Sequence, residues 1–106
     1  MIQKYFEDES GNVRMLGTNE EPGVEALTWK DALASLKPLQ RPDQWWRLPM
    51  VSEALVAVGP DGPGRVIWTR ESDPEVRGNA KVILADGQVD TLPKTEKACV
   101  LPVFLK

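Results

Sequence analysis

The chain has 106 residues, of which 42% are hydrophobic and 27% charged, and its formal net charge is −3. These values are ordinary for one globular domain with a modest core, so we expect a single domain over residues 1–106. The acidic balance argues against nucleic acid as a partner, and no apolar run is long enough to predict a membrane span.

The composition also limits the chemistry. The chain has no histidine, so it lacks the most common general base and the most common transition-metal ligand. Its one cysteine, Cys99, cannot form an internal disulfide, and its apolar neighbours predict a buried, inert thiol. We therefore expect no cofactor, no metal and no enzymatic activity.

The N-terminal region predicts a hairpin with an acidic turn. Residues 2–6 and 12–16 are strand-like and flank the run "EDESGN". Residues 1–25 carry six acids against two bases, a net charge of −4, whereas residues 26–106 have a net charge of +1. This acidic arm is either a solvated surface or a surface that binds one protein partner. The chain starts without a basic region before an apolar stretch, so we expect no signal peptide and a protein that is cytoplasmic, or virion-associated after assembly.

The first helix is expected to begin after Thr28, a good N-cap residue with Asp31 three positions later. Pro38 should end it. Its apolar face follows helical spacing, which makes Trp29 a core residue; the face consists of Trp29, Ala32, Leu33 and Leu36.

The stretch "DQWWRLPMVSEAL" predicts a second helix after two adjacent tryptophans. Pro49 suits the first turn of this helix because no partner is needed there for a backbone N–H. The predicted apolar face consists of Val51, Ala54, Leu55 and Val58, and the loop "GPDGPG" ends the helix. This loop lacks the Lys-Ser/Thr pair and the following helix that a phosphate-binding loop needs.

The last forty residues predict strands. Residues 65–69 are β-branched and aromatic, and residues 80–92 form two runs around Asp86-Gly87, a type I′ hairpin signal. In the closing run 98–106, Pro102 indicates an edge strand or a bulge. The order of hairpin, two short helices and a twisted antiparallel sheet predicts an α+β fold.

Trp68 raises two alternatives. Alternation places Ile67 and Trp68 on opposite faces of a strand, so a core-facing Ile67 would leave Trp68 outward, beside Arg70 and Arg77. If both faces of the sheet are covered, Trp68 belongs to the core instead. On the first alternative the candidate ligand-binding residues are Trp68, Arg70, Glu71, Asp73, Arg77 and Asn79.

The alternating acids Glu71, Asp73 and Glu75 also have two interpretations. In an extended segment they would share one side and would suit Ca²⁺ or a sugar. The interpretation we favour is a polar turn that Asp73-Pro74 initiates.

Several of these motifs together resemble the Lcl-type C-terminal domain, a C-type-lectin-like module of bacterial and phage proteins. The resemblance covers residues 26–105 and is carried by "ALTWKDALASL", "WWRLPMVSEAL", "VIWTRES" and the hairpin with its closing strand. The matching positions are Thr28, Trp29, Ala32, Trp46, Arg47, Leu48, Pro49, Glu53, Trp68, Thr69, Asp86 and Gly87. Residues 1–25 would then be an N-terminal hairpin and acidic arm beside the lectin-like module.

The chain departs from this family at three points. The family usually has Thr or Ser after the proline as a helix cap, where this chain has Met50. Many members join the first helix to the final strand through cysteines, and this chain has only Cys99. The motifs of calcium-dependent sugar lectins are missing as well.

The resemblance implies structural roles and a function. Trp29, Trp46, Arg47 and Pro49 would be structural, with Trp46 filling the core at a corner and Arg47 anchoring the turn; Trp45 lies outside the pattern. The implied function is a non-catalytic binding or structural module that recognises protein or glycan within a phage or other bacterial assembly, with a homo-oligomer also possible. The alternatives are a cytosolic inhibitor or regulator that binds one protein through the acidic arm, and an enzyme working through carboxylates.

Overall fold

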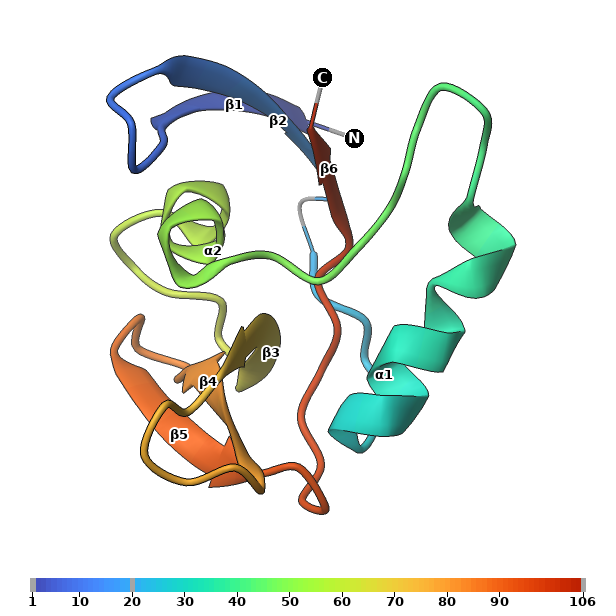
Figure 1. Ribbon diagram of the computed structural model, residues 1–106, viewed down its shortest axis with the longest axis vertical. Coiled ribbons are helices and arrows are strands. Elements are labelled where there is room, and N and C mark those ends of the chain that lie inside the picture. The colour runs from blue at the N-terminus through green and yellow to red at the C-terminus, as the bar shows by residue number, and fades with distance from the viewer. Residues whose placement is uncertain (1, 20, 106) are drawn as a thin grey trace.

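The computed structural model describes residues 2–19 and 21–105, which form two small sheets, two α-helices and a 3₁₀ turn (Figure 1). The elements in chain order are β1 (Ile2–Glu7), β2 (Val13–Thr18), α1 (Trp29–Ser35), η1 (Lys37–Leu39), α2 (Val51–Val58), β3 (Ile67–Ser72), β4 (Asn79–Ile83), β5 (Val89–Pro93) and β6 (Val103–Leu105). The described chain is thus a compact α+β domain with two three-stranded antiparallel sheets, which confirms the predicted fold class. The lectin-like fold remains a prediction.

The strands do not form the single sheet that their order in the sequence suggests. The first sheet has the order β1-β2-β6 and the second has the order β3-β4-β5. The predicted N-terminal hairpin is confirmed, and it pairs with the last strand of the chain.

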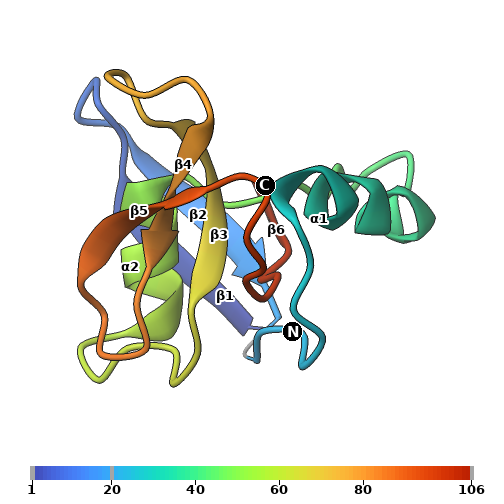
Figure 2. The ribbon, with the colours of Figure 1, turned by 90° about the horizontal axis from the view of Figure 1, so that it is seen from below.

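Helix α2 lies between the two sheets, and α1 lies on the opposite side of the second sheet (Figures 1 and 2). Between α2 and the sheets, Ala54 and Ala57 pack with side chains of both sheets, among them Phe6 and Ile67. On the α1 side, Ala32 and Leu36 pack against Trp68 and its neighbours. Both faces of the second sheet are therefore covered where β3 and β4 pair, whereas no residue of β5 is buried.

The helices begin and end near the predicted residues, but their buried faces differ. The Thr28 side chain accepts a hydrogen bond from the Asp31 N–H at 3.3 Å, which confirms the N-cap. Leu33 and Leu55, which were predicted to face the core, are 38% and 39% exposed. On each helix only a narrow stripe is fully buried, and it consists wholly or mainly of alanine.

Pro49 was expected in the first turn of the second helix, but it lies before the N-cap residue Met50. Its ring is buried, and its carbonyl accepts a hydrogen bond from the Arg70 N–H at 2.8 Å. The proline thus joins the entry of α2 to the second sheet.

The β4–β5 hairpin is confirmed, but its turn is not type I′. A type I′ turn needs a positive φ at both central residues, and Asp86 does not have one. The loop is one residue longer: the Gly87 N–H bonds to the Leu84 carbonyl at 2.8 Å, and Gly87 alone takes a left-handed φ of 92°. This geometry is typical of a three-residue hairpin loop.

Residues 98–105, which we call the closing segment, join the two sheets. Ala98 exchanges backbone hydrogen bonds with Leu27, both of 2.9 Å, and Cys99 forms a parallel bridge with Ile67. After Pro102 the segment changes sheets and becomes β6, an edge strand as the proline predicted. Cys99 is buried within it, as expected. These eight residues thus bond to four separate parts of the fold, which are the segment before α1, β3, β2 and the backbone of Arg47, the partner of Val103.

Candidate functional site

The ligand face predicted around Trp68 does not form. Trp68 has no exposed surface, and its indole N–H donates to the Leu27 carbonyl at 2.7 Å. The alternative in which both faces of the sheet are covered is therefore correct, because Ile67 packs towards α2 and Trp68 packs towards α1. Trp68 offers no surface to a ligand.

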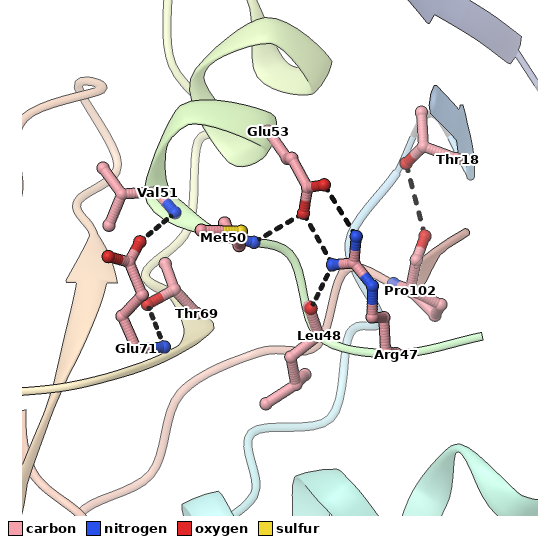
Figure 3. A network of polar contacts seen from close by, with 9 residues as sticks. All are labelled: Thr18, Arg47, Leu48, Met50, Val51, Glu53, Thr69, Glu71 and Pro102. Atoms are coloured by element: carbon pink, nitrogen blue, oxygen red, sulfur yellow. Dashed lines mark hydrogen bonds and ion pairs between the residues drawn. The ribbon is translucent and has the colours of Figure 1, made fainter. Parts of the chain in front are cut away.

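Glu71 bonds to the start of a helix (Figure 3). Its carboxylate accepts a hydrogen bond from the Val51 N–H at 2.6 Å, and Val51 is the first residue of α2. A carboxylate is favourable there because the helix N-terminus carries partial positive charge. In this position Glu71 stabilises α2.

The other predicted ligand residues lie on the β3–β4 hairpin and beside its turn. Arg70 and Arg77 are exposed, while Asp73 and Asn79 are half-buried and close the turn through the Asp73 N–H, which donates to the Asn79 carbonyl at 3.0 Å. The Asp73 carboxylate also accepts from the Glu75 N–H at 2.9 Å, which confirms the polar-turn interpretation. Within residues 2–19 and 21–105, no group of three acidic or cysteine side chains is placed to hold a metal ion.

The corner before α2 has the structure that the resemblance implied. The buried Trp46 ring meets Phe104 edge to face, with ring centroids 4.7 Å apart. Arg47 forms a two-pronged ion pair with Glu53 at 2.6 and 2.7 Å and also donates to the Leu48 carbonyl (Figure 3). Glu53 is only 1% exposed, and such a pair orients both side chains.

Met50 provides no side-chain cap for α2, as its chemistry predicts. Glu53 takes over part of that role, because its carboxylate accepts from the Met50 N–H at 2.8 Å. Because the Glu71 carboxylate accepts from the next N–H, that of Val51, two carboxylates bond to the start of the helix. These two N–H groups are therefore not free to bind an anion.

The remaining tryptophans differ in exposure. Trp29 is half-buried; its indole donates to the Thr69 carbonyl at 3.0 Å, and Lys94 lies 4.4 Å from the ring centroid. Trp45 is 72% exposed.

The feature best suited to binding is a groove between the tip of the N-terminal hairpin and the start of α2. Two cavities of about 400 and 230 Å³ adjoin there and share Asp8, Glu9, Met50 and Ser52. We call this the hairpin groove; its other lining residues are Phe6, Glu7, Ser10, Val51, Leu55, Glu71 and Lys81.

The hairpin groove has a mixed lining, whose apolar part consists of Phe6, Met50, Val51 and Leu55, and an acidic rim. Four carboxylates border it against a single ammonium group, that of Lys81. Asp8 bonds to two backbone N–H groups and forms an ion pair with Arg14 at 3.8 Å, and Glu71 bonds to a third N–H, whereas Glu7 and Glu9 take part in no ion pair within the described parts of the chain. The groove therefore carries a net negative charge.

The predicted site included Glu71 but missed the rest of this groove. The acidic arm was recognised as a possible partner surface, but its position over α2 depends on how the hairpin packs. The sequence signal for one buried hairpin face was the aromatic Phe6 in an alternating strand. In the structure Phe6 is 8% exposed, while its neighbours on β1 are exposed.

Comparisons with known proteins add no assignment: no protein-family model matches the chain, and no curated protein is similar to it at a significant level. Across the described residues, no helix is long and apolar enough to cross a membrane.

Proposed function

We propose that this chain is a non-catalytic binding module that recognises a protein partner through the hairpin groove. The observation that carries the proposal is the combination of accessible apolar side chains with an acidic rim in two adjoining cavities. Apolar contact supplies affinity, and the unpaired carboxylates select the charge of the partner.

The occupant that fits best is a basic segment with an apolar side chain at its centre. Glu7 and Glu9 on the hairpin tip attract lysine and arginine side chains and repel anions. Beneath them Leu55, which is 39% exposed, and the half-buried Met50 and Val51 offer apolar contacts. Because the attraction acts between exposed charges, binding weakens as salt rises.

The chemistry of the chain supports a binding role over a catalytic one. It has no histidine, and its one thiol is buried. Two of its partly or fully buried carboxylates, Glu53 and Glu71, are engaged at the start of α2. The resemblance to Lcl-type modules also supports display of a binding surface, and it suggests a phage or other bacterial assembly as the setting.

The test uses a labelled peptide with leucine between two arginines, and fluorescence anisotropy as the readout. We expect the double variant Glu7→Gln/Glu9→Gln to weaken binding roughly tenfold, because losing two exposed charge contacts costs about 1.4 kcal/mol in total. The matched control is Glu75→Gln/Glu96→Gln, which removes two exposed acids outside the groove and should bind like the wild type.

Three outcomes contradict the proposal. The first is equal binding by both double variants, and the second is equal binding of a peptide with glutamates in place of the arginines. The third is binding to an immobilised oligosaccharide panel in place of the peptide, which would favour a glycan ligand.

A further inference from the structure

The loop after η1 holds a tryptophan in the solvent. Trp45 is 72% exposed, although a tryptophan side chain is costly to leave in water. In Figure 1 the loop extends beyond the end of the helical segment as a green arch. This exposure needs an explanation that the hairpin groove does not give, because Trp45 does not line it.

The loop is held by its own hydrogen bonds. The Gln40 side chain accepts from the Trp46 N–H at 2.8 Å and donates to the Trp46 carbonyl at 2.7 Å. Arg41 and Gln44 bond to each other through their backbones at 3.1 and 3.2 Å. Trp45 is therefore presented on an ordered loop, so little conformational entropy remains to be lost when it binds. Exposed tryptophans on such loops are frequent anchors of protein interfaces.

An apolar groove lies close to this loop. A cavity of about 330 Å³ opens between α1 with η1 on one side and the segment before α1 on the other. We call it the α1 groove; its apolar lining residues are Val24, Leu27, Leu36, Leu39, Val100 and Pro102. Its volume is at the lower end of the range for ligand pockets, about 300–1,000 Å³, and is sufficient for one aromatic side chain.

The charges around the loop and the α1 groove are complementary. Glu21 and Glu25 lie on the rim of the groove, and both are exposed. The exposed base Lys37 begins η1, and the exposed Arg41 lies two residues after its end, with Asp43 as the one acid between Arg41 and Trp45. The basic tryptophan loop of one molecule is therefore attracted to the acidic rim of the α1 groove on another.

We propose that a second copy of this chain is the partner, and that each copy inserts Trp45 into the α1 groove of the other. Loop and groove adjoin on the same chain, because Leu36 lines the groove and its carbonyl accepts a hydrogen bond from Gln40 at 3.1 Å. A twofold axis beside them creates both contacts at once, as a symmetric dimer requires. Each contact then combines a buried indole with two acids of one copy, Glu21 and Glu25, that face the bases of the other.

The first experiment measures the mass of the full chain by sedimentation equilibrium between about 1 µM and 1 mM. The wild type should pass from monomer to dimer, with a blue shift of tryptophan emission as Trp45 leaves water. Trp45→Ala should remain a monomer throughout. The control Tyr5→Ala removes an aromatic residue that is 66% exposed on β1 and should dimerise like the wild type.

The second experiment reverses the charges. Glu21→Arg/Glu25→Arg and Lys37→Glu/Arg41→Glu should each weaken self-association at least tenfold, because each pairs like charges at both contacts. Mixed together, the two double variants should form a heterodimer, since every contact then joins opposite charges. Circular dichroism confirms that each variant is folded.

The proposal is overturned if the wild type is monomeric at all concentrations, or if Trp45→Ala dimerises as strongly as the wild type. It is also overturned if the mixed charge variants fail to associate while each is folded. These outcomes are distinct from those of the peptide assay, because the two grooves share no residues.

Discussion

The adjacent tryptophans give the sharpest test of the fold, because one is core and the other is surface. Trp46 is 7% exposed and packs edge to face on Phe104, whereas Trp45 is 72% exposed. Replacing a buried tryptophan with alanine costs about 3–5 kcal/mol, and the aromatic pair accounts for about 0.5–1.5 kcal/mol beyond burial. We therefore expect Trp46→Ala to lower the free energy of unfolding by about 4 kcal/mol.

Trp45→Ala is the matched control, since it deletes the same atoms one residue away. With little surface buried it should cost about 1 kcal/mol or less. The measurement is urea unfolding followed by far-UV circular dichroism at low micromolar concentration, so that self-association does not contribute. A difference of about 3 kcal/mol corresponds to a difference of at least about 12 °C in Tm for a domain of this size.

Two results would refute this reasoning. If the two variants lose equal stability, Trp46 does not fill the core as the structure shows. If Trp46→Ala changes the slope of the unfolding free energy against urea concentration, the loss of stability does not come from the native packing alone.

Two further predictions concern the same region. Glu53→Ala should lower the free energy of unfolding in urea by about 3–5 kcal/mol, because it leaves the partly buried Arg47 without its carboxylate. The control Asp61→Ala, at an exposed acid, should change this free energy little. A loss below about 1 kcal/mol for Glu53→Ala would contradict the importance of the ion pair. Gly17→Ala should lower stability by about 1–3 kcal/mol, because the added Cβ would overlap the Phe104 ring, and thermal unfolding beside Gly78→Ala, where a Cβ meets nothing within 4 Å, tests this.

Local patterns predicted the elements well, because each depends on residues close in sequence. Thr28 caps the helix that follows it, and the turn residues around Gly87 mark the hairpin. The corner at Trp46 and Arg47 was anticipated through a resemblance, and its partner Glu53 is only six residues away.

Apart from the turn type at Gly87 and the place of Pro49 before α2, the errors arose where a role depends on distant parts of the chain. Alternation in β3 separates Ile67 from Trp68, but only the position of α1 determines that the second face is covered. Glu71 bonds to a backbone N–H twenty residues earlier in sequence, which no local pattern indicates. The hairpin groove likewise exists only because the N-terminal hairpin packs over α2.

The closing segment also determines when the fold can be completed. Protein synthesis proceeds from the N-terminus, so residues 98–105 are the last of the described elements to leave the ribosome. Each hairpin can form early from its own local contacts, but β2 and Ile67 each lack a second neighbouring strand until this segment arrives. During that interval the nascent chain exposes two unpaired strand edges, which makes it vulnerable to aggregation. Final assembly of the two sheets is thus expected only after this segment has been synthesised.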